Sequence, residues 1–256
     1  MQKSLVAGLF TLGVAIGVLL FASTASAGNI VLTGHDDDFH QDLLAQAQAK
    51  AMINFARAGA PNPTLPVLAF DAGSELTTLL GLSGVSIPFT NINPNTGIPA
   101  ASNFDVTKFS AIVVASDFRC GGCDNNDLSS TNLAGAKTPI TDFFNAGGGI
   151  ATFAAASNSH YYDFLPTTAT GFGSPPSTGY VQTAFGATLG IPAVNGDPTH
   201  NFFFEPGTAG VSALFGVVER LGDPNTGTAE TIAIKGASIG GGDGGGFVVT
   251  PPSGVP

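Results

Sequence analysis

The sequence predicts an α/β protein with a mostly parallel sheet that is covered by helices on both faces. Short apolar runs alternate with helical patterns of apolar residues up to about residue 156. These apolar runs end in corners of small and polar residues, and the 256-residue chain is long enough to bury one large core. Strands that alternate with helices are typical of a parallel sheet with both faces covered.

The first 27 residues have the pattern of a secretory signal peptide. Lys3 supplies positive charge, residues 5–21 are apolar, and Ala25-Ser26-Ala27 is a small-residue cleavage site. An uncleaved membrane anchor is the alternative, because the apolar segment is nearly long enough to cross a bilayer. The Ala-x-Ala ending favours cleavage before Gly28. We therefore expect an exported protein that is periplasmic, on the cell surface or extracellular.

One α/β domain is expected over residues 28–250, with its core at 29–165 and an extension at 166–250. The core alternates expected strands and helices, the strands at 30–32, 67–70, 85–89, 109–116 and 150–156 and the helices at 43–56, 75–82 and 138–145. Prolines break the chain after the first helix, Ser74 is a helix N-cap, and a run of three glycines ends the last helix. The segments 91–103 and 118–131 are expected to be loops.

The alternation of strands and helices is less regular in the extension. Residues 180–189 fit a helix or a strand, and residues 200–204 fit a strand. The apolar segments 231–234 and 247–249 flank a glycine-rich turn and predict a C-terminal β-hairpin. The last residues, 251–256, are expected to be a disordered tail.

The composition excludes some classes of partner. Charged residues make up 10% of the chain, against a usual share of about 25%. The formal net charge is −10, so nucleic acid and anionic membrane surfaces are not expected partners. No segment after the signal peptide is long and apolar enough to span a bilayer. A small molecule or a component of the cell envelope is the expected partner.

Polar side chains follow three of the expected parallel strands at their carboxyl ends. They are His35, Asp36, Asp37 and Asp38 after the first strand, Asp117 after the strand at 109–116, and His160 with Tyr161 after the strand at 150–156. Parallel strands joined by helices end at the same edge of a sheet, and ligands of open α/β sheets bind there. We therefore expect His35 and Asp117 to face one cleft with His160 on its rim.

Simpler roles are open for several of these residues. The three aspartates at 36–38 can cap the helix that follows, because carboxylates favour helix N-termini. The segment from Asp124 to Asp127 is a turn of Asx residues or a Ca²⁺ site. Tyr161 is a wall of a binding site or a packing residue, and His200 fits a structural histidine beside three phenylalanines.

The two cysteines stand in Cys120-Gly-Gly-Cys123. In an oxidising compartment this pair can form a small-loop disulfide that pins its loop. Two further interpretations are open, a pair of metal ligands and a redox-active pair. A zinc site needs about four ligands and the chain has no second cysteine pair.

At residues 143–151, Phe-Phe-Asn-Ala-Gly-Gly-Gly-Ile-Ala, the chain resembles the class I glutamine amidotransferase-like superfamily. The resemblance covers roughly residues 29–165 and implies a flavodoxin-like sheet. Amidotransferases place a nucleophilic cysteine after this strand, where the present chain has Ala154-Ala155-Ala156-Ser157. Hydrolysis of glutamine is therefore not expected, and no Gly-x-Ser-x-Gly surrounds Ser157.

The motif His35-Asp36-Asp37-Asp38 is similar to the His-Pro-Asp-Asp motif of the LmbE-like zinc-dependent deacetylases. The resemblance implies that His35 and Asp38 bind a divalent metal, that Asp37 is the general base, and that His160 is a candidate third ligand. Asp36 stands where that family has proline, and Phe39 where it has glutamate.

Three functions are compatible with these patterns. The first is an exported binding or cell-envelope module of amidotransferase-like fold without the amidase nucleophile. The alternative is a metal-dependent, deacetylase-like hydrolase that uses Zn²⁺ or Ca²⁺. The third is a structural surface protein; the signal peptide and composition also resemble exported bacterial proteins with Pro-Glu-Pro sorting tails.

Overall fold

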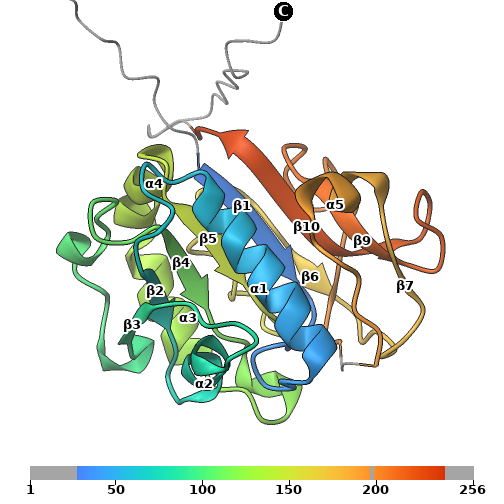
Figure 1. Ribbon diagram of the computed structural model, residues 1–256, viewed down its shortest axis with the longest axis horizontal. Helices are drawn as coiled ribbons and strands as arrows, with labels where there is room; N and C mark the ends of the chain where they lie inside the picture. Colours follow the sequence, from blue (N-terminus) through green and yellow to red (C-terminus); the bar gives the residue numbers. More distant parts are fainter. Residues whose placement is uncertain (1–27, 197–198, 240–256) are drawn as a thin grey trace, which may run out of the picture.

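The computed structural model describes residues 28–196 and 199–239 (Figure 1). The predicted signal peptide, the strand at 247–249 and the tail at 251–256 lie outside the described residues. Within the described part, no helix is both long and apolar enough to cross a membrane.

Five strands form the parallel part of the sheet. They are β1 (Gly28–Thr33), β2 (Val67–Phe70), β3 (Phe89–Ile92), β4 (Ala111–Val114) and β5 (Gly149–Thr152). Their order across the sheet is β3-β2-β4-β5-β1, and each neighbouring pair is parallel. The predicted α/β class with a parallel sheet is confirmed. In flavodoxin the first strand lies between the second and third, whereas here β1 lies beside β5.

The extension adds antiparallel strands on the far side of β1. They are β6 (Gly171–Phe172), β7 (Tyr180–Gln182), β8 (Phe202–Phe203), β9 (Gly216–Leu221) and β10 (Thr228–Ala237). β10 pairs with β1 and also with β8 and β9, so one ten-stranded sheet runs through the described chain. The hairpin partner of residues 231–234 is β9, which precedes them in the sequence.

Helices cover both faces of the sheet, as the sequence predicts. One face carries α1 (Leu43–Ala58), α2 (Glu75–Gly81) and α5 (Ala184–Leu189), and the other carries α3 (Asp127–Gly135) and α4 (Lys137–Asn145). The alternation of β1 sets this arrangement, because Val31 packs under α1 whereas Ile30 and Leu32 pack under α4. Each such fully buried apolar side chain stabilises the fold by about 1.5–3 kcal/mol.

Three local predictions need correction. The expected loop at 118–131 ends early, because Asn126 accepts hydrogen bonds from the backbone N–H of Leu128 and Ser129 and starts α3. The strand expected at 85–89 is β3 at 89–92, since Ser86 has a φ of +51° and interrupts extended backbone. Residues 180–189 contain both a strand and a helix, β7 and α5.

The parallel strands all end at one edge, called the carboxyl edge below. In Figure 1 β4 points downward to this edge, and α1 starts there and runs back toward the top of the view. The short 3₁₀ helix η3 (Phe118–Cys120) follows β4 at the same edge.

Candidate functional site

The corner after β1 is fixed by Gly34. A Cβ atom on Gly34 would lie 1.8 Å from the backbone oxygen of Asn201, so only glycine fits against that segment. The backbone N–H of His200 donates to the carbonyl of Gly34, which ties the extension to this corner. The next two residues, His35 and Asp36, then belong to two different groups of side chains.

His35 enters a closed network with the extension. Its Nε2 lies 3.2 Å from Oε2 of Glu219 on β9 and 3.1 Å from Oε2 of Glu230 on β10. Its Nδ1 lies 2.8 Å from the hydroxyl of Thr199. All three ionisable side chains are fully buried. The backbone N–H groups of Val194 and Gly34 donate to the two glutamates.

The pKa values of the three ionisable groups of this network depend on one another. Burial opposes a charged His35, but Glu230 and Glu219 outweigh it and hold the pKa of His35 well above its usual value. Burial also opposes a charged Glu230, yet His35 holds the pKa of that carboxyl below its usual value. Burial and the charge of Glu230 raise the pKa of Glu219 to about 7. These shifts favour an imidazolium beside a Glu230 carboxylate, whereas the raised pKa of Glu219 favours its protonated form below about pH 7.

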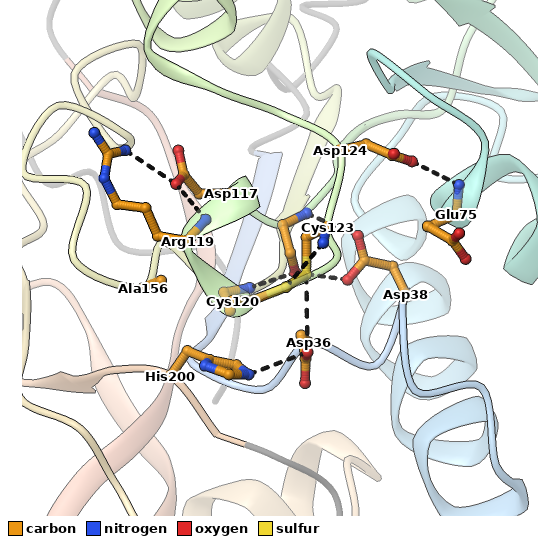
Figure 2. Close-up of a disulfide and its surroundings, with 12 residues drawn as sticks. Asp36, Asp38, Glu75, Asp117, Arg119, Cys120, Cys123, Asp124, Ala156 and His200 are labelled. Carbon is orange, nitrogen blue, oxygen red and sulfur yellow. Dashed lines mark hydrogen bonds and ion pairs between the residues drawn. A yellow bond between two sulfur atoms is a disulfide. The ribbon is translucent and has the colours of Figure 1, made fainter.

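Asp36 faces the other way, into a group that we call the edge cluster: Asp36, His40, His200, Cys120 and Cys123. Figure 2 shows Asp36 with His200 and the two cysteines. Oδ2 of Asp36 lies 3.1 Å from Nε2 of His200 and 3.5 Å from Nε2 of His40. Asp36 is fully buried, whereas the side chains of His200 and His40 are 22% and 39% exposed. Among the described residues, no group is placed to hydrogen-bond to Oδ1 of Asp36. The cluster is therefore open to solvent only through its two imidazoles and Cys120.

The two cysteines form a disulfide, as the sequence predicts, with their Cα atoms 5.9 Å apart. Cys123 is buried and its Sγ lies 3.8 Å from Oδ2 of Asp36, while Cys120 is half-buried. The backbone N–H of Cys123 donates to Sγ of Cys120 at 3.1 Å. The loop between them needs both its glycines, because Gly121 has a φ of +106° and a Cβ on Gly122 would meet the ring of Phe39.

Asp38 joins the β1 corner to its neighbouring strands. Its two oxygens accept hydrogen bonds from the backbone N–H and the hydroxyl of Ser116, at 2.7 and 2.6 Å. The backbone N–H of Ala154 donates to the same hydroxyl. Burial raises the pKa of Asp38 to about 8 against the effect of the Ser116 hydrogen bonds. Asp37, the expected general base, is also fully buried.

Asp117 and Asp124 hold backbone and neighbouring side chains. Asp117 caps η3 and accepts hydrogen bonds from Arg119 at 3.0 Å and from Nδ2 of Asn158 at 2.6 Å. Asp124 accepts from the backbone N–H of Ser74 and of Glu75 at the start of α2. These bonds of Asp124 join distant segments, and the local Asx-type bond of residues 124–127 is the one that Asn126 accepts from the backbone N–H of Leu128.

His160 and Tyr161 are not part of the edge cluster. The side chain of His160 is 77% exposed and its Nδ1 lies 2.9 Å from Asp163. Tyr161 is buried, and its hydroxyl donates to the carbonyl of Ala115 at 2.7 Å. Tyr161 is therefore a packing residue, and not the exposed wall of a binding site.

The metal site implied by the LmbE-like resemblance does not fit this geometry. His35 is engaged by two glutamates, both oxygens of Asp38 are engaged by Ser116, and His160 is paired at the surface. In the described part of the chain, two other groups of three bring their atoms within 4.8 Å of one another: Asp36 with Cys120 and His200, and His35 with Glu219 and Glu230. A sulfur in a disulfide is not a thiolate ligand, and the second group is fully enclosed.

The turn after β5, called the elbow below, contains a residue with positive φ. Ala156 has a φ of +48°, which is uncommon for a residue with a side chain. The backbone N–H groups of Ala155 and Ala156 both donate to Oδ1 of Asn201, at 2.9 and 3.1 Å. Figure 2 places Ala156 near Cys120 and Arg119.

Sequence reasoning missed four residues of these two groups. His40 stands within the predicted motif, five residues from His35, and its spacing from Asp36 was a usable signal. The sequence favours a structural role for His200, whereas in the structure its Nε2 lies 3.1 Å from Oδ2 of Asp36. Glu219 and Glu230 carry no local signal, because only the pairing of β9 and β10 with β1 brings them to His35.

Comparison of the chain with protein-family models, with characterised proteins and with solved structures finds no significant match. The interpretation of the site therefore depends on its own geometry.

Proposed function

We propose that the chain is an exported, non-hydrolytic binding protein with an α/β fold that receives a small molecule or a cell-envelope component at its carboxyl edge. The observation that carries this proposal is the elbow after β5. The residue in the strained position of that turn is Ala156, which has no nucleophilic atom.

The backbone donors of the elbow also argue against acyl transfer. In acyl-transfer enzymes such N–H groups stabilise the oxyanion that develops on the substrate. Here the N–H groups of Ala155 and Ala156 are already bound to the side chain of Asn201. A substrate carbonyl would have to displace this buried amide, so the turn has a structural role.

The groups that remain accessible at this edge are suited to binding. His40 and His200 are partly exposed above the buried Asp36, and Arg119 lies nearby on η3 with 27% of its side chain exposed. Imidazoles and a guanidinium donate hydrogen bonds to the hydroxyl, carboxylate or carbonyl oxygens of a polar ligand. The metal-dependent hydrolase is less well supported, because the three ligands that it needs are engaged elsewhere.

Two measurements test the proposal. Purified protein is first assayed with glutamine, p-nitrophenyl acetate and N-acetylglucosamine oligomers, with and without added Zn²⁺; no turnover above buffer is expected. Turnover that disappears in the Asp38→Asn variant would instead support the hydrolase.

The second measurement is co-sedimentation with purified peptidoglycan and with a neutral polysaccharide. We expect binding that the double variant His40→Ala/His200→Ala weakens by about tenfold, equivalent to 1.4 kcal/mol. The matched control is His160→Ala, which removes an exposed imidazole outside the edge cluster. Equal binding by both variants would contradict a site at the carboxyl edge.

A further inference from the structure

The surroundings of the Cys120–Cys123 disulfide differ from those of a bond that only pins a loop. One sulfur is accessible and the other is buried, since Cys120 is half-buried and Cys123 is 6% exposed. The buried sulfur lies 3.8 Å from Oδ2 of a fully buried carboxylate, Asp36. A reduced Cys123 thiol could donate a hydrogen bond to that oxygen.

Both sulfurs have groups that favour the products of reduction. The backbone N–H of Cys123 points to Sγ of Cys120 at 3.1 Å and would stabilise a thiolate there. His200 lies within 4.8 Å of the same sulfur and adds a donor. On the other side, Asp36 contacts His200 and His40, whose partly exposed rings connect this buried carboxylate to solvent. Among the described residues, Oδ1 of Asp36 has no hydrogen-bond partner.

Four exposed apolar side chains lie at the ends of elements along the same edge. They are Leu43 and Leu44 at the start of α1, Phe118 on η3 and Leu128 at the start of α3. Their exposed fractions are 81%, 54%, 48% and 52% in that order.

We propose that Cys120–Cys123 is an exchangeable disulfide that oxidises a dithiol of another exported polypeptide, with Asp36 as the proton donor and acceptor for Cys123. This activity goes beyond the proposed binding function and does not depend on it.

The exchange takes place in two steps. A thiolate of the partner attacks Sγ of Cys120, a partner–Cys120 disulfide forms, and the Cys120–Cys123 bond breaks with its electron pair moving to Cys123. Cys123 takes a proton through Asp36, which regains one from solvent through His200 or His40. The second partner thiolate attacks the partner's own sulfur and releases Cys120. Cys120 leaves as a thiolate and takes its proton from solvent, to which the partner's two thiols have given theirs. The protein has then gained two electrons and one proton on each sulfur, and the partner holds a new disulfide.

The first test measures reduction of the native protein. The purified full-length protein is equilibrated with mixtures of reduced and oxidised glutathione or dithiothreitol, and free thiols are counted by alkylation and intact mass. We expect reversible reduction of the disulfide with an unchanged circular dichroism spectrum. A disulfide that is reduced only in denaturing urea is a structural bond and would overturn the proposal.

The second test separates the roles of the two sulfurs. In Cys123→Ser the remaining Cys120 should form a mixed disulfide with oxidised glutathione about tenfold faster than Cys123 does in Cys120→Ser, because exposure and thiolate character set the rate. Equal rates, or a faster Cys123, would contradict the assigned order of attack.

The third test addresses Asp36 through the pH profile of dithiothreitol oxidation between pH 5 and pH 9. Asp36→Asn should slow the exchange by about tenfold or more and change the shape of the profile, because general acid–base catalysis contributes on this scale. Asp71→Asn is the matched control, since Asp71 is a buried aspartate at the end of β2 that holds the backbone of Gly73 and Thr77. An unchanged profile in Asp36→Asn would remove Asp36 from the mechanism, and retained folding of both variants would show that the comparison is valid.

Discussion

His35 and Asp36 are neighbours in the chain and lie in opposite kinds of environment. His35 is fully buried between two glutamates and a threonine of the extension, all of them engaged in hydrogen bonds. Asp36 is equally buried, but the side chains around it are partly exposed and one of its oxygens has no hydrogen-bond partner among the described residues. The first group is enclosed and its members are paired, whereas the second has one buried oxygen without a hydrogen-bond partner beneath two partly exposed imidazoles.

The difference indicates where chemistry can occur. A buried ion network holds its charges in one arrangement, and removing a single member leaves another charge unpaired. The edge cluster, by contrast, has two partly exposed imidazoles and a half-buried sulfur that other molecules can reach. We therefore assign stability to the His35 network and reactivity to the edge cluster, and the following predictions test that division.

The largest effect is expected for His35→Ala. This change leaves Glu219 and Glu230 buried together without the imidazolium between them, and should lower the free energy of unfolding by about 3–5 kcal/mol. His200→Ala in the edge cluster should lower the free energy of unfolding by about 1 kcal/mol, because His40 and solvent can still donate hydrogen bonds to Asp36. Urea unfolding followed by circular dichroism measures both. Similar losses in the two variants would show that the two groups do not differ in this way.

A pH dependence of stability should be the second largest effect. Asp38 and Glu219 have folded-state pKa values raised from 3.8 to about 8 and from 4.5 to about 7. Between the unfolded and folded values the native state binds more protons than the unfolded state, so stability falls as pH rises through that window. The slope is at most about 1.4 kcal/mol per pH unit for each group.

The measurement is the free energy of unfolding at pH 5, 6, 7 and 8. We expect it to decrease over this range, and Asp38→Asn should flatten the decrease. The raised pKa of His35 acts in the same direction from about pH 6.5 upward, where the unfolded histidine loses its proton and the folded imidazolium keeps it. The lowered pKa of Glu230 contributes stability that is lost only as pH falls through its folded value, below its usual 4.5. A stability that rises steadily from pH 5 to pH 8 would contradict the assigned protonation of Asp38.

Ser116→Ala tests how Asp38 is held between the β1 corner and the strand ends of β4 and β5. The variant removes the hydroxyl that donates to Asp38 and accepts from the N–H of Ala154, and should cost about 1–3 kcal/mol. Ser157→Ala removes an exposed serine at the end of the next strand and serves as the control. Equal melting temperatures for the two variants would show that Asp38 does not depend on Ser116.

The smallest effect is expected for His160→Ala. This exposed ion pair with Asp163 lies outside both groups, and such surface pairs contribute about 0–1 kcal/mol. Thermal unfolding with and without Zn²⁺ checks this prediction and also the metal role implied by the resemblance. A stabilisation by Zn²⁺ that is lost in His160→Ala would restore His160 as a ligand.

The sequence by itself determined the class of fold and the edge where polar residues gather. The alternation of apolar runs and helical patterns defines the parallel strands, and their shared direction brings Asp36, Asp38, Ser116 and Asp117 to one edge. The disulfide was also predictable, because two cysteines three residues apart can form only a small local loop.

Only the tertiary structure decided what each of these side chains contacts. Glu219 lies 184 residues after His35 in the sequence. No local pattern predicts that β10 pairs with β1, or that β9 pairs with β10 and so places Glu219 beside His35. The same holds for His200, which lies beside Asp36 because its backbone N–H donates to the carbonyl of Gly34. Local periodicity predicts which segments are strands and helices. The burial and charge of a side chain depend instead on contacts with segments that are distant in the sequence. That is why His35 was expected in an open cleft and lies in a closed ion network.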